Sequence, residues 1–164
     1  ITNYDLEKRL QLFALLNNVA INKENIDQYA KRMLSLMIDE KLQNEQIKNY
    51  NIYINDVEIE SYITQAYIKN DQNINDLMVI LENNNINISI LNEFVRVLLG
   101  WNELSGRLYY RSSEINEVDL ENIIKQDPSL SNKDARNILL QKQISLRAKK
   151  LLRDIRAEAN IENR

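Results

Sequence analysis

The chain has 164 residues and a formal net charge of −3, with only 2 glycines, 1 proline, no cysteine and no histidine. That length allows one domain, or two small ones, around a real core. The shortage of Gly and Pro argues against all-β folds, which need many tight turns, and against glycine-rich phosphate loops. Without Cys and His, disulfides, thiolate or imidazole metal sites and Ser-His-Asp triads are excluded. The negative charge argues against nucleic-acid binding through bulk positive charge.

No run of the sequence approaches the roughly 18 apolar residues of a membrane span. We therefore expect no membrane-spanning segment. The chain starts with Ile1 rather than Met, which indicates a processed or truncated protein. Any signal peptide would precede the given sequence.

The residue pattern predicts helices from the start of the chain. Thr2 with Asp5 three residues later forms a capping box at the start of a first helix. A second, longer helix begins at Asn22 or Asn25 and ends near Lys48. Its apolar positions form more than one stripe, which is typical of a helix packed between neighbours.

Asparagines predict the next helix boundaries. Asn55 with Glu58 begins a third helix, and Asn73 begins a short fourth one. The triplet at 83–85 ends the fourth helix, and we expect one of its asparagines to be left-handed. Asn87 then begins a fifth helix that continues to about residue 111.

The fifth helix contains Gly100, which should weaken it by up to about 1 kcal/mol relative to Ala. Asn116 begins a sixth helix, which ends at Asp127–Pro128 because Pro cannot continue a helix. Ser131 with Asp134 begins the seventh, from residue 132 to about 158. Its expected apolar stripe is Leu140, Ile144, Ala148, Leu151 and Ile155. We predict an all-α fold, an irregular bundle of six to seven helices with at most one short terminal strand, near 160–163.

Five segments carry motifs in a fixed order: ITNYDLEKRL at 1–10, MLSLMIDEKLQNEQI at 33–47, INDVEI at 54–59, INEVD at 115–119 and LLRDIRAEANIE at 151–162. The first fits I-T-x-x-[DE]-L-x-x-[RK]-[LIV], and the last contains the R-A-E-A-x-I-E ending. In order and spacing, the five resemble the SurA family of periplasmic chaperones and peptidyl-prolyl isomerases, over nearly the whole chain.

The resemblance implies a fold like the SurA N-terminal domain and a single chaperone-like helical domain over 1–164, in which 132–164 packs back on the N-terminal helices. It implies a periplasmic location, and its clients would be unfolded outer-membrane proteins or peptides. The family places parvulin isomerase domains before the last helix, where this chain has only residues 126–131. Parvulin sites also use histidines, so isomerase activity is not carried over.

No residue pattern indicates an enzyme, and we expect no cofactor and no bound metal. Acidic pairs such as Asp39–Glu40 and Glu114–Glu117 fit solvated helix faces better than acid–base or metal chemistry. A holdase needs no catalytic residue, because an apolar cradle that repacks around varied clients suffices.

We predict that clients bind exposed apolar side chains on the long helices, rather than charge. The candidates are Met33, Met37, Trp101 and Tyr109, although helical spacing also allows each to be core. The alternative function is a helical scaffold or adaptor that binds one specific folded partner. The sequence leaves open whether the chain forms a homodimer.

The seventh helix supplies a first test of the predicted single module. Its stripe is too long for the short sixth helix to cover, so we expect it to pack on the first two helices. Truncation after Asn132 should then unfold or aggregate the remaining chain. Circular dichroism and urea unfolding measure this, and a truncated protein with full helicity and stability would contradict the predicted packing.

Overall fold

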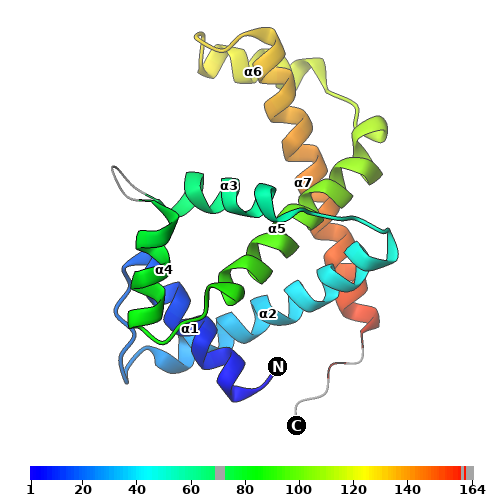
Figure 1. Cartoon of the computed structure of the whole chain (residues 1–164). Helices are drawn as coiled ribbons and strands as arrows, with labels where there is room; N and C mark the ends of the chain where they lie inside the picture. The colour runs from blue at the N-terminus through cyan, green and yellow to red at the C-terminus, as the bar shows by residue number, and fades with distance from the viewer. Residues whose placement is uncertain (69–72, 160, 162–164) are drawn as a thin grey trace. The chain divides into compact units, whose positions relative to one another are not determined.

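A computed structural model describes residues 1–68, 73–159 and 161 of the chain. These residues form seven α-helices and one short 3-10 helix, with no strand among them (Figure 1). The all-helical class predicted from the sequence is confirmed. The strand expected near 160–163 lies outside the described residues, apart from Ile161, which belongs to no regular element.

The helix bounds agree closely with the capping pattern. In chain order the elements are α1 (Asn3–Asn17), α2 (Ile26–Asn49), α3 (Asp56–Tyr67), α4 (Ile74–Asn83), α5 (Ile88–Tyr109), the 3-10 helix (Tyr110–Ser112), α6 (Glu117–Gln126) and α7 (Asn132–Glu158). The chain divides into two compact units, Ile1–Trp101 and Asn102–Arg164, and each is described here by itself. The packing of 132–164 on the N-terminal helices stays a prediction.

Three helices begin with a complete capping box. In the first, the Thr2 hydroxyl accepts a hydrogen bond from the Asp5 backbone N–H at 3.1 Å, and the Asp5 carboxylate accepts one from the Thr2 N–H at 2.8 Å. The same reciprocal bonds join Asn55 to Glu58 and Asn73 to Asp76. Each box pairs two backbone donors that a helix start would otherwise leave without a partner.

Asparagine also makes the left-handed turns that end helices. The non-glycine residues with positive φ in the described part of the chain are Asn18, Asn51 and Asn85, with φ of 53°, 51° and 54°. Asn tolerates this region better than most residues. Asn85 is the left-handed member expected in the triplet at 83–85, which confirms that prediction.

The core of the first unit is built by side chains from α1 to α4, from the first part of α5 and from the connections between helices. The largest fully buried ones are Leu12, Ile63, Leu81, Ile86, Leu91 and Val95. Within this unit α1 packs against α2, and α3 packs against α4. The first part of α5 contributes Leu91 and Val95 to the same core.

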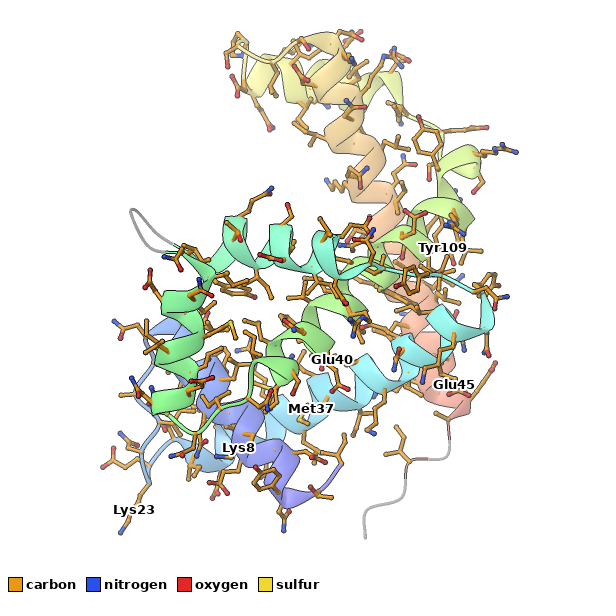
Figure 2. The ribbon with its side chains drawn as sticks, viewed as in Figure 1. Lys8, Lys23, Met37, Glu40, Glu45 and Tyr109 are labelled. Carbon is orange, nitrogen blue, oxygen red and sulfur yellow. The ribbon has the colours of Figure 1, made fainter. Side chains whose placement is uncertain are left out.

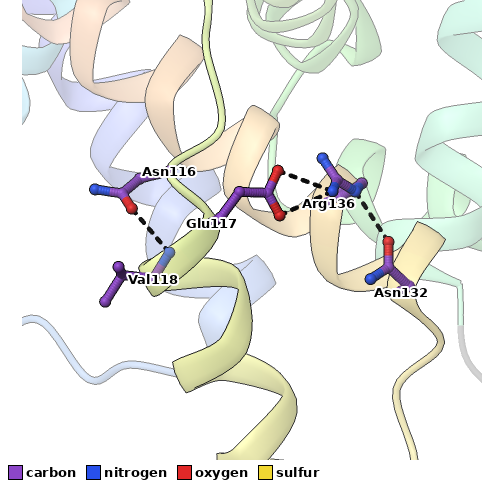
Figure 3. A network of polar contacts seen from close by, with 5 residues as sticks. All are labelled: Asn116, Glu117, Val118, Asn132 and Arg136. Carbon is purple, nitrogen blue, oxygen red and sulfur yellow. Dashed lines mark hydrogen bonds and ion pairs between the residues drawn. The ribbon is translucent and has the colours of Figure 1, made fainter.

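In the second unit α6 packs against α7 through a small apolar cluster of Leu120, Ala135 and Leu139. Sequence spacing placed Leu140 in the stripe of α7, but Leu139 is buried there and Leu140 is only partly buried. At the N-terminal end of α7 the buried face therefore lies one residue away from the predicted stripe, on the side that faces α6. Figure 3 shows the polar edge of the contact, where Arg136 donates to Glu117 at 2.9 and 3.0 Å.

Gly100 has a packing reason that the sequence did not reveal. A methyl group at this position would lie 2.9 Å from Cδ1 of Ile47 and 3.2 Å from its Cγ2. Ile47 is buried and β-branched, so its side chain has little freedom to move away. Gly100 thus lets α5 approach α2 closely, whereas Gly106 in the same helix has no atom within 4 Å of such a methyl group.

These two glycines make a matched pair for a stability test. We expect Gly100→Ala to destabilise the protein by about 1 kcal/mol, because overpacking outweighs the gain in helix propensity. Gly106→Ala should instead stabilise it by up to about 1 kcal/mol. Urea unfolding measures both. The cost of Gly100→Ala should shrink in an Ile47→Val background, and equal effects at the two glycines would refute the close approach.

Candidate functional site

The candidate site is a cleft of about 630 Å³ in the first unit, lined by α1, α2 and the first part of α5. Its apolar lining comes from all three helices. These side chains are Tyr4, Met37, Ile90, Phe94 and Val97. The volume lies within the usual range for ligand sites in proteins. Figure 2 shows Lys8 on α1 and Met37 and Glu40 on α2, three of the lining residues.

An ion pair lies in the wall of this cleft. Nη2 of Arg9 donates to Oε1 of Glu40 at 2.7 Å, and the two side chains are only 10% and 24% exposed. The guanidinium also stacks on the ring of Phe94, with its carbon 4.1 Å from the ring centroid. One residue from each of the three helices therefore meets here, which fixes the guanidinium plane within the cleft wall.

Burial perturbs the carboxyl group of this pair. Loss of solvent raises the pKa of Glu40 above its usual value of 4.5, and the nearby Asp39 adds to the rise. The attraction and hydrogen bond of Arg9 lower that pKa but do not offset the burial. The interpretation of Asp39–Glu40 as a solvated helix face is therefore wrong for Glu40, which is partly buried and paired.

The rim of the cleft carries further charges of both signs. Lys8 donates to Gln11 at 3.1 Å, and Arg96 pairs with Asp56 at 2.6 Å. Asp5 belongs to the capping box of α1, where hydrogen bonds from Thr2 lower its pKa. The remaining charged lining residues are Lys41, Lys48 and Glu93. The cleft therefore combines an apolar lining with a polar rim.

The four residues predicted to bind clients have different environments. Met37 lines the cleft and is partly exposed. Met33 and Trp101 are only 6% and 8% exposed, so they take the core alternative that the sequence left open. Tyr109 lies in the second unit, where the guanidinium of Arg147 stacks 5.9 Å from its ring centroid. A role for the four residues in client binding stays a prediction.

Sequence reasoning missed Arg9 and Glu40, although each gives a signal. Arg9 follows Leu6 by three residues and precedes Phe13 by four, so it lies within the apolar stripe of α1. Glu40 follows Met37 by three and precedes Ile47 by seven, which places it on the buried face of α2. Two opposite charges on the inner faces of neighbouring helices indicate a paired site, because buried charges need partners.

Comparison of the chain with protein-family models, curated proteins and solved structures found no match. Within the described residues, no three or more Asp or Glu side chains gather as a metal site would require. No helix in the described part of the chain has the length and apolar character needed to cross a membrane.

The raised pKa of Glu40 predicts how stability depends on pH. A carboxyl group with a raised folded-state pKa binds its proton more tightly when folded, so its contribution to stability falls as pH rises from 4.5 through the raised value. Wild type should therefore lose stability over that window relative to Glu40→Gln, which cannot titrate there. Urea unfolding of both proteins over a pH series measures the difference.

The pKa values of Asp5 and Asp127 are lowered, so their contributions to stability change with pH in the opposite direction. Both residues are present in the wild type and in the variant, so these contributions cancel in the difference. A wild-type-minus-variant stability that stays level, or rises with pH, would contradict a raised pKa of Glu40.

Proposed function

We propose that the chain is a holdase chaperone that binds unfolded polypeptide segments in the cleft between α1, α2 and α5. The observation that carries the proposal is the lining of that cleft, in which Met37 and aromatic side chains from other helices reach the surface together. Methionine and aromatic side chains suit varied ligands, because they repack around different shapes. The chemistry requires no cofactor.

The expected affinity is modest. Burying one client aromatic removes about 150–250 Å² of surface from water, which gives several kcal/mol. Ordering a disordered client offsets much of that gain, so a single segment should bind with a dissociation constant in the micromolar range. Such weak binding lets a client leave and fold, as a holdase requires.

The nature of the clients and the location of the protein come from the resemblance to SurA. We propose unfolded outer-membrane proteins as clients and the periplasm as the compartment. Strands of outer-membrane barrels alternate apolar and polar side chains. That alternation fits a cleft with an apolar lining and a charged rim, because successive client side chains point in opposite directions.

A second candidate function, an adaptor for one folded partner, has an observation of its own. The α2–α3 connection is fixed by the left-handed Asn51 and by the buried Ile52 and Ile54. Tyr53 in this connection is 82% exposed, and Val57 in the first turn of α3 is 76% exposed. Rigid, exposed aromatic side chains are typical anchors of specific protein interfaces.

The test of the holdase proposal compares an apolar position in the cleft with one outside it. Met37→Ser should weaken the suppression of client aggregation several-fold, because it removes apolar lining from the cleft. Val79→Ser is the control, because Val79 is 54% exposed on α4 and does not line the cleft. Light scattering of an unfolded outer-membrane protein, with an unrelated soluble client alongside, measures the effect.

Binding should persist at high salt, since the apolar contacts are not screened. Equal losses in the two variants would refute the cleft as the binding site. One tight stoichiometric complex that Tyr53→Ser abolishes would support the adaptor.

A further inference from the structure

The Arg9–Glu40 pair has hydrogen-bonding capacity that the described residues do not use. A guanidinium has five N–H donors and a carboxylate has two acceptor oxygens. The pair uses Nη2 and Oε1 for each other, and no other hydrogen bond within the described residues involves either side chain. No buried side-chain N or O atom in that part of the chain lacks a partner, so the unused atoms retain contact with solvent. Both residues line the cleft.

We propose that this pair binds the backbone of one extended client residue in the cleft. A free N–H of Arg9 donates to the client carbonyl, and Oε2 of Glu40 accepts the client N–H. In an extended chain the N–H and C=O of one residue point to the same side, as in the bonded pairs of an antiparallel sheet. One client residue can therefore bind the Arg9 N–H and the Glu40 Oε2 at the same time. This backbone clamp rests on the proposed function and adds the chemistry that the cleft recognises.

The charge of the pair favours a neutral amide over a charged ligand. A client carboxylate near Arg9 would also meet Glu40, and a client ammonium near Glu40 would meet Arg9. A peptide unit carries a donor and an acceptor without net charge, so it is complementary to both members. Hydrogen bonds to charged groups are also stronger than those between neutral groups.

The clamp is preorganised by its neighbours. Phe94 lies 4.1 Å beneath the guanidinium carbon, and Glu40 holds one edge of the guanidinium at 2.7 Å. Arg9 and Glu40 both lie in the interior of long helices, away from the frayed ends. Little side-chain entropy remains to be lost on binding, which raises the affinity available from two hydrogen bonds.

Backbone recognition would also distinguish unfolded from folded polypeptides. In a folded protein nearly all backbone N–H and C=O groups already have partners. An unfolded segment offers them freely, whatever its side chains. The clamp therefore supplies recognition that is independent of client sequence, while Met37 and the aromatic lining contact the client side chains.

The test removes one backbone N–H at a time from a probe. The probe is an end-capped, uncharged, serine-rich peptide with a single tyrosine, which fixes its register in the cleft. Each analogue has one amide replaced by an ester, which keeps the shape but removes the donor. We expect the ester at one position to weaken binding to the wild-type protein about ten-fold. Fluorescence titration measures the dissociation constants.

Protein variants then assign that loss to Glu40. In Glu40→Gln the side-chain oxygen stays with Arg9, and the amide N–H₂ faces the cleft in place of an acceptor. The parent peptide should then bind about ten-fold more weakly than it binds the wild-type protein. The ester should cause no further loss in this variant. Glu117→Gln is the matched control, because it alters the ion pair with Arg136 outside the cleft and should keep the ten-fold ester effect. Circular dichroism checks that both variants fold.

The outcomes separate the clamp from the proposed function. If no ester weakens binding while Met37→Ser still does, the clamp is wrong and the cleft still binds clients. An ester effect that is unchanged in Glu40→Gln also overturns the clamp. A parent peptide that does not bind the wild-type protein overturns the clamp, and if the unfolded client also fails to bind, the proposed function fails with it.

Discussion

The interaction on which the cleft depends is the ion pair between Arg9 and Glu40 beneath the surface of the first unit. Removing two charges from water costs free energy that their mutual attraction often fails to recover. The raised pKa of Glu40 indicates that burial outweighs attraction here. A well-packed apolar pair could hold α1 against α2 equally well. Stability alone is therefore a weak explanation for the presence of an ion pair at this position. A binding role is a stronger one, since it uses the polar atoms that remain open.

Sequence reasoning worked where the physical cause is local. A capping box spans four residues, and the boxes predicted at Thr2 and Asn55 both form. The left-handed Asn85 likewise depends on the ability of one residue to adopt a positive φ. Because such short-range hydrogen bonds set where each helix begins and ends, the all-helical class could be read from the sequence alone.

The same reasoning failed where burial depends on a distant neighbour. Arg9 and Glu40 are 31 residues apart, and no local pattern reports the distance between their helices. Gly100 is a weak point by helix propensity, yet its missing side chain makes room for Ile47. Leu139 and Leu140 are both plausible stripe positions, and only the direction from which α6 approaches decides between them. Of the predicted client-binding set, Met37 alone lies in the cleft, because spacing cannot separate a core face from a cleft wall.

The two candidate functions use surfaces with different physical character. Tyr53 on the α2–α3 connection and Val57 in the first turn of α3 offer exposed apolar shape, which suits one complementary partner. The cleft offers apolar lining with one donor and one acceptor, and it matches a feature that every unfolded chain shares. A folded partner has few free backbone groups, so the polar half of the cleft would have nothing to bind and its desolvation would count against the complex. We therefore expect the cleft to prefer unfolded chains, and that expectation is the physical argument for the proposed holdase function.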